Sequence, residues 1–164
     1  MAVNTLHEIA IEQVDGRTCL EFLEYWNRKR IGAEPASRHS FDPLIEKPHL
    51  APYLMIFEPV EGDRDFRVRL MGTQVMAFIG DDVTGRLLSR HCFPDDVENA
   101  VGLFRKCARI REPVAAEGFY QWRNRDFDNW QAVIAPLRLY GAEVEQFLCC
   151  LCQAKSRKLF DLKP

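Results

Sequence analysis

Hydrophobic positions near the amino terminus recur at the spacing of an amphipathic helix. Leu20, Leu23 and Trp26 follow one another every three residues, so they share one helix face that must cover an apolar surface. Residues 18–21 have the sequence of a capping box, in which the Thr18 hydroxyl and the Glu21 carboxylate each bind a free backbone N–H. The pattern predicts a helix over about residues 18–31.

Two further helices are expected in the middle of the chain. Apolar residues at positions 97, 100, 101, 104 and 108 mark the buried side of a long helix that opens at Pro94-Asp95-Asp96 and cannot continue past Pro113. Ahead of it, residues 73–79 are expected to form a short helix, with Thr73 as the N-cap and Gly80 at its end. The proline-rich connector 34–53 is expected to hold one helical turn, around residues 41–46.

Five segments have the length and alternation of β-strands: residues 53–60, 65–71, 114–122, 130–139 and 144–153. In the second, Phe66, Val68 and Leu70 alternate with Arg67 and Arg69, which predicts one apolar and one cationic face. The last segment is apolar on both faces in its second half, so we expect it at the centre of the sheet. The order of elements predicts an α+β fold with a five-stranded antiparallel sheet, inserted helices and a flanking N-terminal helix.

Composition and charge narrow the kind of protein. The chain has 164 residues, of which 47% are hydrophobic and 28% charged, and its formal net charge is −2. The length suits one domain with a full core, and the charge gives no reason to expect nucleic-acid binding. No apolar stretch reaches the roughly 18 to 20 residues of a membrane span, and the amino terminus lacks the features of a signal peptide. We therefore expect a soluble, cytoplasmic protein with no membrane or nucleic-acid partner.

Neither catalysis nor metal binding is expected from the residues. The sequence holds no nucleophile motif, phosphate-binding glycine loop or zinc-protease signature, so we expect no enzymatic activity. Alternation sends Cys149 to one face of its strand and Cys150 and Cys152 to the other, so three thiolates converge only with the help of another element. Buried free thiols are the expected state of these cysteines, and a redox role is left open.

Several motifs together resemble the PAS domain family, and in particular the short bacterial proteins, common in alphaproteobacteria, that consist of little beyond one such domain. In chain order they are Tyr25-Trp26, Pro48-His49-Leu50-Ala51-Pro52-Tyr53-Leu54, Asp65-Phe66-Arg67-Val68-Arg69-Leu70-Met71-Gly72-Thr73 and Gly80-Asp81-Asp82-Val83-Thr84-Gly85-Arg86. The resemblance implies a sheet of order 2-1-5-4-3 cupped around a small-molecule pocket. It divides the chain into a flanking region over residues 1–33, a PAS-like domain over residues 34–154 and a tail over residues 155–164.

The resemblance leaves the ligand unknown, because fold alone does not name one. Flavin-binding light sensors of the wider family carry a reactive cysteine shortly after a Gly-Arg pair, whereas Gly85-Arg86 is followed here by Leu87-Leu88-Ser89, and Cys92 is displaced from that position. Haem-binding relatives place a ligand histidine on the long helix, and residues 95–111 contain none; His91 precedes them. The residues thus argue against both flavin and haem. Arg67 and Arg69 are candidate anion contacts, because guanidinium groups suit carboxylates and phosphates.

We expect a sensory and regulatory module that binds a small molecule in its core and signals through protein–protein contact. The candidate pocket residues are apolar and come from the inserted helices and the later strands: Met76, Phe78, Ile79, Val101, Phe104, Ile134 and Leu148. The alternative is a ligand-free dimerisation or docking adaptor, in which Phe22, Leu23 and Trp26 cover a partner instead of their own sheet. Both hypotheses suit a homodimer or a signalling protein partner.

Overall fold

The computed structural model of the chain describes residues 5–91, 96–120 and 128–155. Its strands are β1 (Thr5–Ile9), β2 (Leu54–Val60), β3 (Asp65–Met71), β4 (Val114–Tyr120), β5 (Asp128–Arg138) and β6 (Val144–Gln153). Its α-helices are α1 (Arg17–Lys29), α2 (Pro43–Glu46), α3 (Thr73–Ile79), α4 (Leu88–His91) and α5 (Val97–Ile110). Three short 3₁₀ helices are η1 (Ile11–Gln13), η2 (Arg38–Ser40) and η3 (Ala51–Tyr53).

The strands form one antiparallel sheet of order β1-β4-β5-β6-β2-β3. The five strands expected from the sequence stand in the expected order, and β6 lies between β5 and β2. The central position of the last strand is confirmed, because its residues are buried from both faces of the sheet. The expected end of the strand at Trp122 and the expected start of the long helix at Pro94-Asp95 lie outside the described residues.

The sheet has a sixth strand, which the alternation pattern did not predict. Strand β1 pairs with β4 from Thr5 opposite Phe119 to Ile9 opposite Ala115, and it forms one edge of the sheet. Its two buried apolar residues, Leu6 and Ile9, belong to the cores on opposite faces of the sheet. Because they are three positions apart, they give no period-two signal. The expected five-stranded sheet is therefore corrected to six strands.

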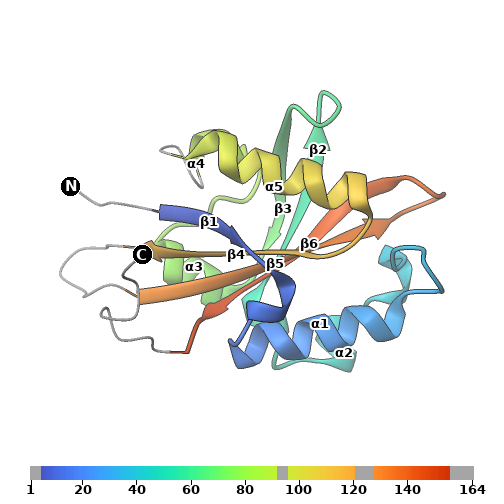
Figure 1. Cartoon of the computed structure of the whole chain (residues 1–164), viewed down its shortest axis with the longest axis horizontal. Helices are drawn as coiled ribbons and strands as arrows, with labels where there is room; N and C mark the ends of the chain where they lie inside the picture. Colours follow the sequence, from blue (N-terminus) through green and yellow to red (C-terminus); the bar gives the residue numbers. More distant parts are fainter. Residues whose placement is uncertain (1–4, 92–95, 121–127, 156–164) are drawn as a thin grey trace.

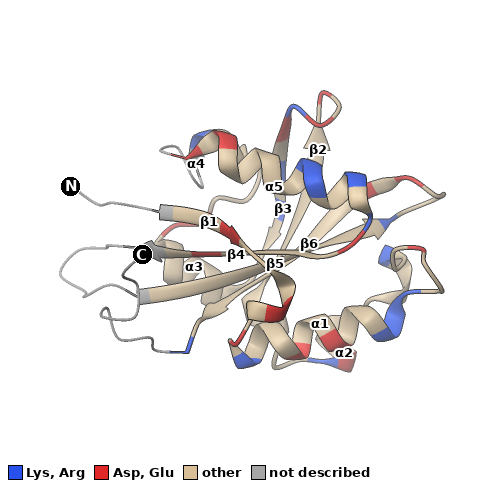
Figure 2. Cartoon of the chain, viewed as in Figure 1, with Lys and Arg blue, Asp and Glu red and all other residues tan. Residues whose placement is uncertain are grey.

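Helices cover both faces of the sheet and make two separate apolar cores (Figure 1). Helices α3, α4 and α5 lie on one face, which we call the α5 face. Helix α1 and the connector that contains α2 lie on the other, which we call the α1 face. In Figure 2 the charged residues gather on the outer helices and the turns, whereas the middle of the sheet is mostly uncharged. Each face therefore buries an apolar layer beneath an amphipathic helix.

Helix α1 begins without the capping box expected at Thr18 and Glu21. Its N-cap is Gly16, whose backbone N–H donates to Gln131 Oε1 at 2.9 Å. The Glu21 carboxylate instead binds His49 Nε2 at 2.6 Å. A buried side chain from the neighbouring strand β5 thus does what local capping was expected to do, and the helix starts at Arg17.

The corner between β3 and α3 also differs from its prediction. Gly72, and not Thr73, is the N-cap of α3, and no side chain caps this end. A Cβ added to Gly72 would overlap the Pro52 carbonyl and lie 2.7 Å from the Ala51 carbonyl oxygen. Glycine is needed here because the corner packs directly on the backbone of η3. Gly80 ends α3 at a φ of 87°, as predicted.

A β-bulge changes the phase of β3. Ile56 of β2 is opposite Leu70, while the next residue, Phe57, is opposite Val68, so Arg69 is the extra residue. Phe66 and Val68 are fully buried as expected, but Leu70 is 48% exposed and Met71 is buried in its place. The expectation that Leu70 lies on the apolar face is wrong, because a bulge shifts every later residue to the other side of the strand.

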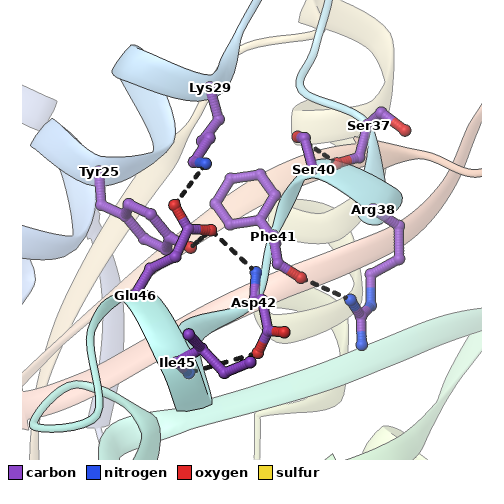
Figure 3. Close-up of polar contacts among 9 residues, drawn as sticks. All are labelled: Tyr25, Lys29, Ser37, Arg38, Ser40, Phe41, Asp42, Ile45 and Glu46. Carbon is purple, nitrogen blue, oxygen red and sulfur yellow. Dashed lines mark hydrogen bonds and ion pairs between the residues drawn. The ribbon is translucent and has the colours of Figure 1, made fainter.

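Polar contacts hold the connector against α1 (Figure 3). The Tyr25 hydroxyl donates to Glu46 Oε1 at 2.9 Å, the Asp42 backbone N–H donates to the same oxygen at 3.2 Å, and Lys29 Nζ lies 2.5 Å from Glu46 Oε2. The Asp42 carboxylate caps α2 by accepting from the Ile45 backbone N–H at 3.3 Å. The helical turn expected around residues 41–46 is confirmed as α2.

Candidate functional site

An apolar cavity of about 90 Å³ lies between the sheet and the helices of the α5 face. Every element of that face except β3 contributes to its wall. The lining residues are Leu6, Met55, Phe57, Phe78, Ile79, Leu88, Ala100, Leu103, Phe104, Ala116, Trp130, Ala132, Ile134, Cys149 and Leu151. We call this space the cavity.

Four of the seven candidate pocket residues line the cavity: Phe78, Ile79, Phe104 and Ile134. Met76 and Val101 pack in the same core but do not reach the cavity wall. The prediction that Leu148 lines the pocket is wrong, because this residue lies in the core of the α1 face. On β6 it is Cys149 that points toward α5, so the neighbouring Leu148 must point away.

Small residues explain why space remains on this face. Ala100 of α5, Ala116 of β4 and Ala132 of β5 all line the cavity, and alanine has no side-chain atom beyond Cβ to fill it. Elsewhere in the same core four rings pack closely: the Phe104 ring lies 4.8 Å from those of Phe57 and Phe66 and 5.3 Å from that of Phe147. The sequence did not predict these alanines, because alanines 115 and 135 of the same two strands lie in the opposite core and no local signal distinguishes the two sets.

A second hollow, of about 400 Å³, adjoins the cavity and opens beside the start of α1. We call it the mouth; it is lined by Arg17, Thr18, Tyr53, Gln74, Val75, Ala77, Phe78, Leu151, Cys152 and Gln153. Phe78 and Leu151 line both spaces, and each is half-buried. The wall between the apolar cavity and the polar mouth therefore includes these two side chains.

A groove of about 530 Å³ lies on the α1 face, between the connector and the β2–β3 hairpin. Its floor includes Ile56 and Leu148, and Leu44 and Leu70 stand at its sides. Its lining cation is Arg38, whose Nη1 donates to the Phe41 carbonyl at 3.1 Å (Figure 3). The groove is larger and more open than the cavity, and it lies on the opposite side of the sheet.

The candidate anion contacts do not meet at any of these three spaces. Arg67 and Arg69 are exposed on β3, and neither lines the cavity, the mouth or the groove. Among the described residues neither side chain has an ion-pair partner. The side chain of His91 and all of Cys92, considered above for haem and flavin, lie outside what the structure describes.

Helix α1 covers its own sheet. Phe22 and Trp26 have no exposed surface, and Leu23 packs at the edge of the same core. Trp26 Nε1 donates to the Pro136 carbonyl at 3.0 Å, and the Arg30 guanidinium lies 5.0 Å above the Trp26 ring. The apolar face of this helix is thus occupied within the chain.

The groups with shifted pKa values are mainly buried thiols and the side chains that hold the connector against α1. Burial and the adjacent Glu46 carboxylate raise the pKa of Tyr25 to about 12. Lys29 and then the Tyr25 hydroxyl hold the pKa of Glu46 below its ordinary value. Burial raises the pKa of the Cys107 thiol. Across residues 5–91, 96–120 and 128–155 no group of His, Cys, Asp and Glu is arranged to hold a metal ion.

An antiparallel sheet with helices on both faces and an apolar cavity under one of them defines an α+β domain with an internal pocket. The chain belongs to the PAS domain family: the family model described as PAS domain matches residues 14–152. PAS domains are sensory and regulatory modules, and they commonly dimerise and mediate protein interactions. No helix within the described residues is long and apolar enough to cross a membrane.

A solved structure supports the fold independently. The solved structure described as "Flavin Analogue Sheds Light on Light-Oxygen-Voltage Domain Mechanism" is similar to this chain. The TM-score is 0.51 and the sequence identity 19%, over 70% of this chain and 87% of that chain. At this identity the likeness concerns the fold alone. No curated protein matches the chain.

Proposed function

We propose that this PAS domain is a cytoplasmic regulatory module that binds a small apolar or amphipathic molecule in the cavity and signals by contact with another protein. The observation that carries the proposal is the adjacency of two spaces: an apolar cavity and a polar mouth lie on either side of the half-buried side chains Phe78 and Leu151, which line both. Ligand sites of this kind are mostly apolar with a few polar groups that orient the ligand.

The volume limits the ligand. Sites for drug-sized molecules have roughly 300–1,000 Å³, whereas the cavity has about 90 Å³. We therefore favour a short alkyl chain or a single ring in the cavity, with a polar head group in the mouth beside Arg17 and Gln74. A flavin is not the ligand that we propose, since its three fused rings and polar edge suit neither the size nor the apolar wall of the cavity.

The mouth offers a route from ligand to signal. Arg17 and Thr18, which form the first turn of α1, line the mouth together with Gln74 of α3. A head group held there would contact both helices directly. A ligand shifts a conformational equilibrium only by its differential affinity for the two states, so we expect the bound state to differ in how the start of α1 packs against β6.

A titration with octan-1-ol and octanoate tests this function. We expect saturable chemical-shift changes in the methyl groups of Ile79, Leu103 and Ile134, which line the cavity. Ala116→Leu fills the cavity and is expected to weaken binding at least tenfold. Ala115→Leu is the matched control, because Ala115 is the preceding residue of β4 and lies in the opposite core. Methyl shifts that do not saturate, or equal binding by wild type and Ala116→Leu, would contradict the proposal.

A second candidate function, that of an assembly adaptor, is favoured by the groove on the α1 face. Leu44, Ile45 and Leu70 are 75%, 79% and 48% exposed, and Leu44 and Leu70 line the groove. Exposed apolar side chains around a hollow are typical of interaction sites. Light scattering on wild type and on Leu70→Asp tests this role. If the protein assembles through the groove, wild type is a dimer and the variant is a monomer. A monomeric wild type would contradict the homodimer.

A further inference from the structure

Three thiols meet where α1 packs on the central strand. Cys19 of α1 faces Cys150 and Cys152 of β6, and all three are buried in the core of the α1 face. Cys152 Sγ donates to Cys19 Sγ over 2.7 Å, while the Cys19 thiol is directed at the Gln131 and Cys150 carbonyl oxygens at 3.6 and 3.7 Å. Helix α1 is thus the further element that brings a third cysteine to this side of β6.

The contact between Cys19 and Cys152 needs the glycine at the start of the helix. A Cβ added to Gly16 would overlap Cys152 Sγ and lie 2.9 Å from the Gln153 carbonyl oxygen. The missing side chain lets the first turn of α1 come close to β6. The 2.7 Å between the two sulfur atoms compares with about 2.05 Å in a disulfide bond.

Cys152 is the more exposed residue of the pair. Cys152 lines the mouth and keeps 6% of its surface exposed, whereas Cys19 has none. Cys107, by contrast, is fully buried on the inner side of α5, with its thiol directed at the Ile134 carbonyl at 3.5 Å. The pair thus combines one cysteine that lines the mouth with a second that is fully buried.

We propose that Cys19 and Cys152 are a redox modification site, at which a hydroperoxide that enters the mouth produces a reversible disulfide. Cys152 Sγ attacks a peroxide oxygen, the O–O bond breaks, and the leaving alcohol or water takes the thiol proton, so that Cys152 becomes a sulfenic acid. Cys19 Sγ then attacks Cys152 Sγ. The S–S bond forms as the S–O bond breaks, and the hydroxide leaves as water with the Cys19 proton. One peroxide is reduced as two thiols are oxidised.

The disulfide would tether the first turn of α1 to the end of β6. Because the mouth lies between these two elements, oxidation fixes the position of the segment that lines it. Both thiolates are scarce: the pKa of Cys152 is raised by its contact with Cys19 and by burial, and the pKa of Cys19 is raised by its contact with Cys150 and by burial. The attack on the peroxide is therefore slow, because the thiolate is the nucleophile, and the proximity of Cys19 Sγ directs the second step to this pair.

Peptide mapping of the folded, full-length chain after exposure to hydrogen peroxide tests the site. We expect a loss of the mass of two hydrogen atoms, a crosslinked peptide pair that contains Cys19 and Cys152, and full reversal by dithiothreitol. Cys152→Ser should abolish the crosslink, and Cys107→Ser, the matched control in the other core, should leave its rate within about twofold of wild type. Hydrogen exchange in the first turn of α1 should slow at least fivefold in the oxidised protein.

The wild-type map alone decides the question if a cysteine variant does not fold. A Cys19–Cys152 crosslink that forms in the folded chain and not in urea supports the site. Peroxide treatment that leaves both thiols free in the folded chain, or that couples Cys152 to other cysteines as readily as to Cys19, overturns it. Because no ligand is involved, these outcomes are independent of the titration with octan-1-ol.

Discussion

The two faces of the sheet are built from similar residues but are filled differently. On the α1 face, Trp26 and Phe22 are buried in the core without exposed surface, and the indole donates to the Pro136 carbonyl at 3.0 Å. On the α5 face, alanines stand opposite each other and an apolar cavity remains. Interiors normally pack to the density of organic crystals. We therefore expect the α1 core to contribute more to stability, while an unfilled apolar cavity remains on the α5 face.

Polar contacts fix both ends of the helix on the α1 face. The start of α1 is held by Gln131, and its end by Arg30, whose guanidinium binds both Glu112 oxygens at 2.7 Å. Glu112 follows the end of α5, so this ion pair joins the helix layers around the edge of the sheet.

Trp26→Ala should have the largest effect. Removing a fully buried indole leaves a void in the packed face, and we expect a loss of about 3–5 kcal/mol in the free energy of unfolding. Urea denaturation measures it. Leu20 was expected on the covered face of this helix, but it is 45% exposed, so Leu20→Ala should stay within about 0.5 kcal/mol of wild type. Equal losses for the two variants would mean that α1 does not cover its own sheet in solution.

The neighbouring alanines of β4 compare the two faces directly. Ala115→Leu adds atoms to the packed face and should destabilise the chain by about 1–3 kcal/mol. Ala116→Leu adds the same atoms to the cavity, where there is room, and should change stability by less than about 1 kcal/mol. Thermal unfolding of both variants measures the contrast. If Ala116→Leu were the more destabilising, the cavity would not be available space.

The Arg30–Glu112 pair should contribute less than either core. Glu112 is 46% exposed, so solvent screens the pair, and we expect Arg30→Gln to cost about 0.5–1 kcal/mol. Arg28→Gln, which breaks the exposed pair with Glu24 on the same helix, serves as the control and should cost less. The difference should shrink in 1 M salt. A salt-independent loss would point to the stacking of Arg30 on Trp26 instead.

The Glu46 contacts should make the α1 face sensitive to acid. The folded-state pKa of Glu46 lies below its ordinary value of 4.5. The stabilisation that Glu46 gives the folded chain is therefore complete above pH 4.5 and is lost as the pH falls through the folded-state pKa. Wild type should therefore exceed Glu46→Gln in melting temperature near neutral pH, and the gap should close in acid. Tyr25→Phe, which removes one donor, should narrow the gap. Parallel curves at every pH would show that the network does not titrate as described.

Local patterns predicted much of this fold, and contacts between distant segments account for the rest. Alternation identified β2 to β6 and their order because buried strands carry period-two or continuous apolar signals. It missed β1, whose Leu6 and Ile9 serve opposite cores, and the bulge at Arg69, which no local signal marks. The capping of α1 by Gln131 joins residues more than a hundred positions apart. For the same reason, the site residues Phe78 and Ile134 could be predicted, but the alanines and the meeting of Cys19 with Cys152 could not.

A crystal pressurised with xenon tests the contrast between the faces most directly, because xenon enters dry apolar cavities. We predict one strong xenon site on the α5 face, among Phe104, Ala116 and Ile134, which disappears in Ala116→Leu and persists in Ala115→Leu. Xenon bound beneath α1, or at neither face, would contradict the claim that the enclosed apolar cavity of this domain lies on the α5 face of the sheet.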